Sequence, residues 1–339
     1  MNKKNVTLKT IAELAGVSRV TVSQILNTNT ATPRASRETC ERVRRIAREL
    51  NYQPNLIAQT LTNGSSRIIG VLLDSMASGY SLALLGSIEE EASRHGYRVM
   101  VGIAHDSPER FHNCYQLFRQ YHVAGVISMA HTYPGREADI IANFAEEKNI
   151  VYIFPPPFPA AACVEVDVAA GIEAACAHLR ANGASRLGML SEDGVYPDTL
   201  ARLEAFRRCE PGGHIEFIAP SDRRTDEQHG SRFHRAVEQL IEAGIDGLIT
   251  MSDLWAAAAA GMMARRGIAV PGDIKLVGLG NSPICDYSEP ALSSIDMRAG
   301  TVAGAAVEML LNLVADKSVS PVVITPELVR RGSSGAAGI

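Results

Sequence analysis

A short stretch near the N-terminus, residues 18–26, carries side chains suited to reading DNA bases. At helical spacing Val22, Ile25 and Leu26 fall on one face, which predicts the buried side of a helix. The side chains left outward are small, polar or basic: Arg19, Val20, Thr21, Ser23 and Gln24. Such groups match the donors, acceptors and methyl groups that base pairs present in the major groove. The spacing therefore predicts a base-reading helix, although any small three-helix bundle has a similar pattern.

The charge distribution supports a nucleic-acid partner for this part of the chain alone. Residues 1–67 hold eleven Lys and Arg against four Asp and Glu, whereas the rest of the chain holds twenty-two against thirty-three. A basic head on an acidic body favours a polyanionic partner for the head. A basic face that is merely solvated is the alternative that charge by itself leaves open.

Three short helices are predicted to position these side chains. Thr7 can cap a first helix that Gly16 ends, Ser18 can cap the second helix, and Ser36 can cap the third. Two helices joined by a tight glycine turn form a helix-turn-helix, whose second helix enters the major groove of DNA.

The sequence around these helices closely resembles the DNA-binding head of the LacI/GalR family of bacterial transcription regulators. The resemblance lies in VTLKTIAELAGVSRVTVSQILN (6–27) and ERVRRIARELNYQPN (41–55). It implies an apolar contact of Val20 with a thymine methyl and a bidentate bond of Gln24 to adenine. Many members have Arg where Gln24 stands, so a different base is expected at that position of the half-site. The DNA contacts implied in the head are Thr7, Leu8, Ser18, Arg19, Val20, Thr21, Ser23, Gln24, Asn27 and Tyr52.

The segment that follows, residues 51–66, is a candidate linker or hinge helix. Pro54 is tolerated at a helix start, and Asn63-Gly64 would end a helix that is too short to be stable alone in water. The resemblance implies a hinge helix that folds on DNA, with Leu61 wedged between base steps in the minor groove. The contacts implied there are Asn55, Ala58, Gln59 and Leu61. The loop before the third helix, 28–34, is longer than is usual in the family.

From residue 67 onward, strand-like apolar runs alternate with amphipathic helical stretches. The predicted strands are Ile68–Leu73, Arg98–Ile103, Gly125–Met129, Ile150–Phe154, Arg186–Leu190, Ile215–Ile218, Gly247–Met251 and Lys275–Leu279. This alternation predicts parallel sheets with helices on both faces, in two units. The predicted fold class is an all-α helix-turn-helix head plus an α/β core of two doubly wound parallel-sheet lobes.

The core also resembles that of the LacI/GalR family, which is similar to periplasmic sugar-binding proteins. The resemblance implies a ligand cleft between two lobes and three chain crossings, near 159–165, 288–296 and 320–325. It divides the chain into a helix-turn-helix domain (1–50), a hinge and linker (51–66) and an effector-binding and dimerisation domain (67–339). The N-lobe is expected to comprise about 67–160 and 292–322, and the C-lobe about 164–290 and 323–332.

Polar residues at the strand ends are candidate effector contacts, because ligands of open α/β sheets bind beyond the carboxyl ends of the strands. Arg202 matches the cleft arginine of the family, and Tyr80 or Trp255 could stack on a sugar ring. The candidates are Asp74, Tyr80, Asp167, Arg202, Ser252, Asp253, Trp255 and Asn281. A helix cap for Asp253 and a place in the core for Trp255 are the alternatives.

The sequence indicates the chemical class of the effector less clearly than it indicates the DNA-binding head. Many sugar-binding members have Asp near Gly280-Asn281, and loss of that carboxylate removes an acceptor for sugar hydroxyls. A sugar or sugar derivative, held by Arg202 and Asn281, remains the favoured effector. A phosphorylated or acidic effector would also suit a cleft that keeps an arginine and lacks the acid.

Other protein classes find no support in the sequence. The patterns G-x-G-x-x-G, G-x-x-x-x-G-K-[ST] and G-x-S-x-G do not occur, so we expect no enzyme, no catalytic residue and no cofactor. His229 and His234 are five residues apart, off the spacing of a shared helical metal site. The six cysteines lie far apart, as in a reducing cytoplasm. We expect neither a membrane span nor a secretory signal.

These features predict a cytoplasmic, nucleoid-associated homodimer that binds double-stranded DNA at a pseudo-palindromic operator. Repression of carbohydrate-utilisation genes is the default, with activation as the alternative. A dimer is favoured over a tetramer because the C-terminal tail has no heptad-bearing helix. Two other hypotheses are a solute-binding or sensor protein whose head docks another protein, and a regulator that needs a protein co-repressor.

Overall fold

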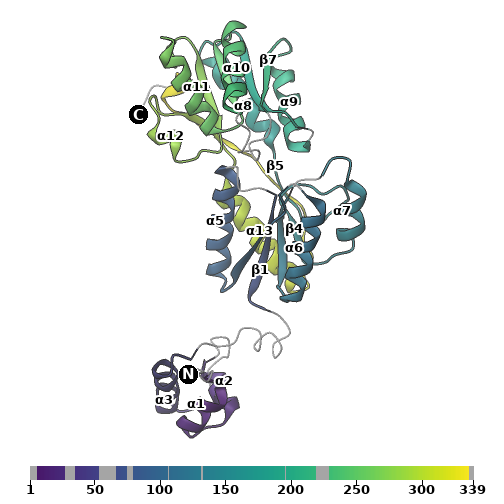
Figure 1. Ribbon diagram of the computed structural model, residues 1–339, viewed down its shortest axis with the longest axis vertical. Helices are drawn as coiled ribbons and strands as arrows, with labels where there is room; N and C mark the ends of the chain where they lie inside the picture. The colour runs from purple at the N-terminus through teal and green to yellow at the C-terminus, as the bar shows by residue number, and fades with distance from the viewer. Residues whose placement is uncertain are drawn as a thin grey trace. The chain divides into compact units, whose positions relative to one another are not determined.

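The computed structural model describes residues 6–26, 35–52, 66–74, 79–105, 107–130, 133–194, 196–218 and 229–335. They belong to two compact units, Met1–Ser66 and Arg67–Ile339, which are called the head and the core below (Figure 1). The division between the units lies where the sequence predicts the core to begin.

The described part of the head contains three helices. They are α1 (Leu8–Ala15), α2 (Arg19–Leu26) and α3 (Arg37–Glu49). Each begins at its predicted cap, where a side-chain oxygen accepts a hydrogen bond from a backbone N–H: Thr7 from Thr10, Ser18 from Thr21 and Ser36 from Thr39. Gly16 ends α1 in the left-handed conformation, with φ 64°. The predicted helix boundaries are therefore confirmed.

The N-lobe of the core is a parallel four-stranded sheet covered on both faces. Its order is β2-β1-β3-β4. The strands are β1 (Ile68–Leu73), β2 (Arg98–Ile103), β3 (Gly125–Met129) and β4 (Ile150–Tyr152). The helices are α5 (Gly79–Arg94), α6 (Pro108–Gln120), α7 (Glu137–Phe144) and α13 (Ala299–Val314). Val71 packs with α5 and α13, whereas its neighbour Leu72 packs with α6 and α7, as alternation along a strand requires.

The C-lobe contains a six-stranded sheet of order β12-β10-β9-β8-β6-β7. Its strands are β6 (Leu187–Glu192), β7 (His214–Ile218), β8 (Gly247–Thr250), β9 (Lys275–Leu279), β10 (Ser293–Asp296) and β12 (Glu327–Val329). All neighbours are parallel except β12, which runs antiparallel to β10. The helices are α8 (Val168–Ala181), α9 (Pro197–Cys209), α10 (His229–Glu242), α11 (Asp253–Arg265), α12 (Ile284–Tyr287) and the short 3₁₀ helix η1 (Gly332–Ser334).

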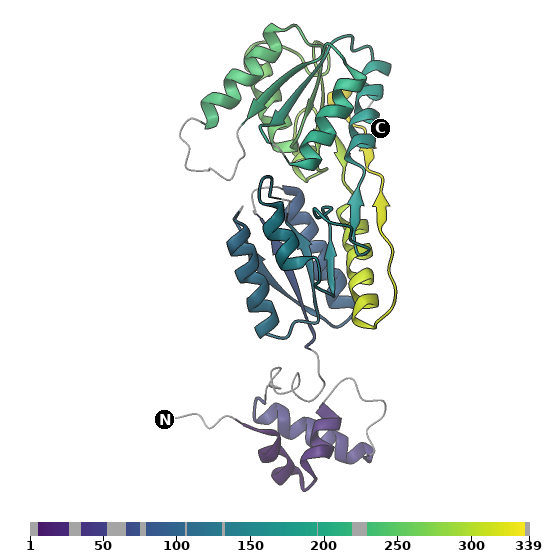
Figure 2. The ribbon, with the colours of Figure 1, turned by 90° about the vertical axis from the view of Figure 1, so that its right-hand side faces the viewer.

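The chain crosses between the lobes three times. Two of the crossings are strands that pair in parallel, β5 (Val164–Val166) and β11 (Val322–Ile324). Figure 2 shows them side by side, teal and yellow, between the two sheets. The remaining crossing lies between β10 and α13, at Met297 and Arg298.

One predicted lobe boundary is wrong. Residues 292–296 were expected in the N-lobe, but β10 pairs with β9 and β12 inside the C-lobe sheet. The middle crossing therefore follows this strand and does not contain it. The strand has only four residues, too few to give a clear periodic signal in the sequence.

Candidate functional site

The outer surface of α2 is the candidate DNA-reading surface. Val22 and Ile25 are buried in the core of the head, which turns Arg19, Val20 and Gln24 to the outside. Val20 is 66% exposed, so its methyl groups are available for a contact with a partner. The predicted outward orientation is confirmed for Arg19, Val20 and Gln24.

Thr21 departs from that expectation. It is half-buried, and its hydroxyl lies 2.8 Å from Ser18 Oγ. With 3.6 residues per turn, position 21 falls away from the surface that carries Val20 and Gln24. Thr21 and Ser18 therefore form the start of the helix, while Ser23 stays at the border of the exposed surface.

The predicted DNA contacts outside α2 differ in their exposure. Thr7 is exposed at the start of α1, whereas Leu8 and Tyr52 are half-buried and pack against the core of the head. Burial raises the pKa of the Tyr52 hydroxyl above its ordinary value, so the group is a hydrogen-bond donor at neutral pH, as an unperturbed tyrosine also is. The remaining candidates, Asn27, Asn55, Ala58, Gln59 and Leu61, lie outside the described residues. The hinge helix therefore stays a prediction.

The second candidate site is a cavity of about 210 Å³ in the core. Its walls come from both lobes: Tyr80 on α5 and Phe154 beyond β4 on one side, and α9 with the ends of β6, β8 and β9 on the other. Beyond the carboxyl ends of parallel strands is where open α/β sheets bind ligands. We call this the interlobe cavity.

Two of the predicted effector contacts, Tyr80 and Arg202, line the interlobe cavity. Arg202 Nη2 donates a hydrogen bond to Asp198 Oδ2 at 2.6 Å, one helical turn earlier on α9. Tyr80 Oη and Arg202 Nε are buried and have no hydrogen-bond partner among the described residues. Burial raises the pKa of Tyr80, so its hydroxyl remains a donor. Unpaired buried polar atoms cost free energy that a ligand can recover.

The other predicted contacts are not brought to this cavity. Asp167 and Ser252 cap helices α8 and α11, accepting hydrogen bonds from the N–H groups of Ala170 and Leu254. Buried Asp74 accepts a hydrogen bond from the Tyr133 hydroxyl.

Trp255 and Asn281 are also engaged within the protein. Trp255 is 7% exposed in the C-lobe core, as the alternative reading of the sequence had it. Asn281 donates to Asp296 Oδ2 and accepts from Arg331 Nη2 through its side-chain amide.

Asp253 is the centre of a buried polar cluster. The carboxylate is 2% exposed and accepts hydrogen bonds from Ser294 Oγ at 2.5 Å and from the N–H and hydroxyl of Ser282 at 2.7 and 2.8 Å. These bonds tie α11 to the loop after β9 and to β10. Asp253 was predicted to cap a helix or to contact a ligand, but its carboxylate instead holds parts of the C-lobe together.

Three carboxylates of the interlobe cavity, Glu165, Glu192 and Asp198, are not among the residues predicted from the sequence. The Asp that many family members have near Gly280-Asn281 is absent, but these other segments bring acids to the cavity. Glu192 ends β6, two residues beyond the predicted end of that strand, and Asp198 precedes Arg202 by one helical turn. The i, i+4 spacing to Arg202, the predicted cleft arginine, was the signal available for Asp198.

The described residues contain no group of three His, Cys, Asp or Glu arranged to hold a metal ion. Within the same residues, no helix combines the length and apolar character needed to cross a bilayer.

Comparison with known proteins relates both units to characterised domains. Residues 7–55 match the bacterial regulatory proteins of the lacI family, and residues 176–334 match the periplasmic binding protein-like domain. The chain is 27% identical over 340 residues to the HTH-type transcriptional regulator GalR of Escherichia coli, covering 96% of this chain and 95% of that protein. It is 28% identical over 318 residues to the ribose operon repressor of Bacillus subtilis, covering 94% of each.

Solved structures share the fold. The lac repressor dimer bound to operator and the anti-inducer ONPF superposes with a TM-score of 0.80, at 24% identity, over 98% of this chain and 99% of that one. The complex of the transcriptional regulator CelR with cellobiose gives 0.65 at 20% identity, over 97% and 99%.

With these matches, the fold places the chain among DNA-binding transcriptional regulators that carry an effector-binding domain. Within that class, residues 7–55 carry the DNA-binding domain of the bacterial regulatory proteins of the lacI family, and the chain is similar to GalR along 96% of its length. The resemblance stated from the sequence and the predicted fold class are both confirmed.

The cluster around Asp253 generates a first prediction. Asp253→Ala leaves buried Ser294 and half-buried Ser282 without their acceptor, so we expect it to lower the free energy of unfolding of the C-lobe by about 3 kcal/mol. Ser252→Ala, the control next to it, removes one helix cap and costs about 1 kcal/mol. Urea unfolding followed by the fluorescence of Trp255, the one tryptophan of the sequence, measures both. Wild-type stability for Asp253→Ala would contradict the structural role.

Proposed function

We propose that this protein is a homodimeric repressor of carbohydrate-utilisation genes whose operator affinity is set by a small uncharged polyhydroxyl effector. The observation that carries the proposal is the presence of two unpartnered buried atoms, Tyr80 Oη and Arg202 Nε, in the interlobe cavity. They come from different lobes, so a ligand that bonds to both stabilises one arrangement of the lobes. Operator affinity then changes by at most the effector's preference for that arrangement.

The charges of the cavity favour an uncharged effector. The lining of the cavity contains three carboxylates, those of Glu165, Glu192 and Asp198, and one guanidinium, that of Arg202. Carboxylates accept hydrogen bonds from hydroxyl groups and repel phosphates and acids. Tyr80 and Phe154 offer aromatic faces for an apolar ring surface. Among the relatives, the names of the ribose operon repressor and of the CelR complex with cellobiose refer to sugars.

The DNA-reading surface supplies the sequence specificity. Val20 provides an apolar contact for a thymine methyl, and the Gln24 amide provides the donor and acceptor that adenine pairs with. Arg19, at the first turn of α2, contributes charge toward the phosphate backbone. A repressor of this kind acts in the cytoplasm, at the nucleoid, and no catalytic role is assigned to any of its residues.

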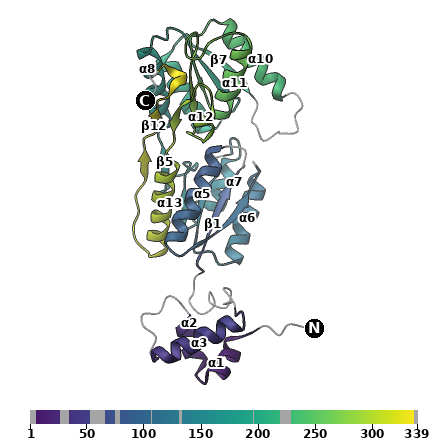
Figure 3. The same cartoon turned by 90° about the vertical axis from the view of Figure 1, so that its left-hand side faces the viewer.

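Large exposed apolar side chains on both lobes support dimerisation through the core. Leu82 on α5 and Val101 on β2 are 46% and 42% exposed, and Leu254 on α11 and Tyr287 on α12 are 64% and 86% exposed. Figure 3, like Figure 1, has α5, α11 and α12 on the same side of the core. The lac repressor is a dimer in its operator complex. A two-fold dimer presents two heads, and these require a pseudo-palindromic operator.

The effector site is tested by Tyr80→Phe, which removes only the unpartnered hydroxyl. We expect about fivefold weaker effector binding, the value of one hydrogen bond, while the free protein becomes no less stable, because the removed hydroxyl is buried without a partner. The effector is first identified by a thermal-shift screen of neutral sugars, sugar phosphates and sugar acids, and its affinity is then measured by calorimetry. Tyr121→Phe, at an exposed position, is the control. Selection of sugar phosphates over neutral sugars would contradict the proposed effector class.

The base-reading role of α2 is tested by Gln24→Ala. We expect discrimination at one base pair of each half-site to fall by about 1–3 kcal/mol, because one bidentate contact is lost. Site selection from random duplexes, followed by affinity measurements on single-base variants, gives this number. Gln239→Ala, at an exposed position of α10, should select the same sites as the wild type. An unaltered preference in the Gln24→Ala protein would exclude this glutamine from base reading.

The dimer is tested by combining Leu254→Asp with Tyr287→Asp. Two charges placed in an apolar interface without partners should convert the dimer into monomers in sedimentation velocity. Leu200→Asp, at a side chain that is 44% exposed on α9, should remain a dimer. A double variant that still sediments as a dimer would show that the interface lies elsewhere.

A further inference from the structure

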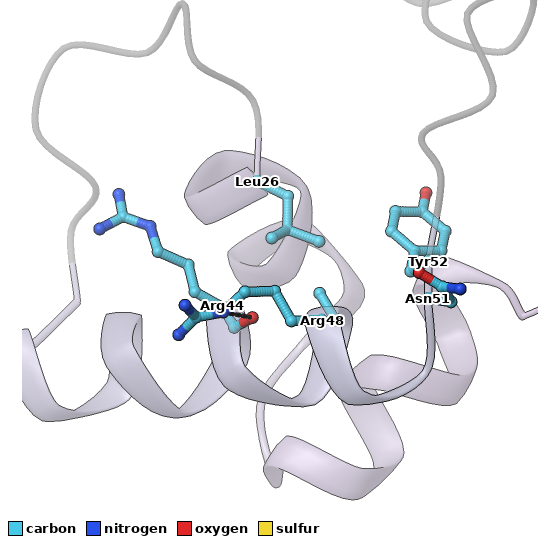
Figure 4. A pocket seen from close by; sticks show the side chains of 6 residues that line it. Leu26, Arg44, Arg48, Asn51 and Tyr52 are labelled. Carbon is cyan, nitrogen blue, oxygen red and sulfur yellow. Dashed lines mark hydrogen bonds between the residues drawn. The ribbon is translucent and has the colours of Figure 1, made fainter.

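A surface hollow of about 670 Å³ lies on the head, apart from the outer surface of α2. It is bordered by Leu26 at the end of α2, by Arg44 and Arg48 on α3, and by Asn51 and Tyr52 beyond α3. In Figure 4, Leu26 faces α3 across the hollow and the Arg48 side chain lies along α3 toward Arg44. Arg48 Nε donates to the Arg44 carbonyl oxygen at 3.4 Å. The hollow therefore combines a small apolar floor with cationic and polar groups.

The two arginines of the hollow differ from others on the same helix by lacking a counter-charge. Arg37 is paired with Glu41 at 3.1 Å and Arg45 with Glu49 at 4.0 Å. Among the described residues, neither Arg44 nor Arg48 has a carboxylate within ion-pair distance. Like charges four residues apart repel each other and destabilise a helix. The repulsion is relieved when an anion binds between the two guanidinium groups.

The polar groups of the hollow suit a phosphate in particular. Guanidinium groups donate paired hydrogen bonds to phosphate oxygens. The Tyr52 hydroxyl and the Asn51 amide are further donors beside them. The described lining residues contribute no carboxylate that would repel such an anion.

The source of the phosphate follows from the neighbours of the hollow. Leu26 is the last residue of α2, the helix whose outer surface reads bases, and Tyr52 is itself a predicted DNA contact. The hollow therefore lies at the C-terminal end of the base-reading helix. We propose that Arg44 and Arg48 bind one backbone phosphate of the operator in this hollow, next to the bases that α2 reads. The inference rests on the proposed DNA-binding function and adds a sequence-independent contact that fixes how each head lies on the duplex.

The salt dependence of operator binding tests this contact. Arg44→Gln with Arg48→Gln removes both charges from the full-length protein and retains helix propensity. Each phosphate contact contributes about 0.9 to the slope of log affinity against log salt, so a dimer that loses one per head should lose about 1.8. Between about 50 and 200 mM salt the double variant should then weaken about 12-fold less than the wild type. Affinities for operator and for scrambled duplex should fall by the same factor.

Arg45→Gln is the matched control, because it removes the same charge from the same helix at a paired position. Arg44→Gln and Arg48→Gln alone should each lower the slope more than Arg45→Gln does. The proposal would be overturned if the double variant kept the wild-type salt slope. It would also be overturned if the double variant lost affinity for the operator but not for the scrambled duplex. Calorimetry with inorganic phosphate separates the two sources of the anion: phosphate binding to the DNA-free protein with an unchanged slope would assign the hollow to a free anion and overturn the DNA contact. A wild-type protein without preference for any duplex would instead overturn the proposed function.

Discussion

The packing of α2 against the other two helices of the head is the constraint on which DNA recognition depends. Val22 and Ile25 are buried together with Ile11 and Val43, and this burial fixes the rotation of α2 about its axis. Burying two aliphatic side chains is worth about 3–6 kcal/mol, far more than any polar contact on the outer surface. Polar and basic side chains can therefore vary on that surface without altering the fold that presents them.

The core meets a different constraint, since the proposed function places a ligand between its two lobes. Three crossings join the lobes, and two of them are strands that pair with each other. The buried cluster around Asp253 holds α11 and β10 together inside the C-lobe. Tyr80 and Arg202, in contrast, belong to different lobes and meet only across the interlobe cavity. Under the proposed function, a ligand that bonds to both groups favours one arrangement of the lobes.

Local features of this protein were predictable from sequence, whereas contacts between distant segments were not. The caps Thr7, Ser18 and Ser36 and the long apolar strands of both sheets carry their signals within a few residues. The role of Asp253 depends on Ser282 and Ser294, which lie 29 and 41 residues away in the sequence. Glu165 reaches the cavity from a crossing strand of only three residues. Such encounters are decided by tertiary packing, which periodicity does not report.

The most direct measurement compares the affinity of the full-length protein for its own promoter DNA with its affinity for a scrambled duplex of the same length and composition. At physiological salt, a head that reads bases through α2 predicts a preference of about a thousandfold or more for the promoter. Equal and weak binding to both duplexes, lost together as salt is raised, would contradict sequence reading and leave only electrostatic attraction.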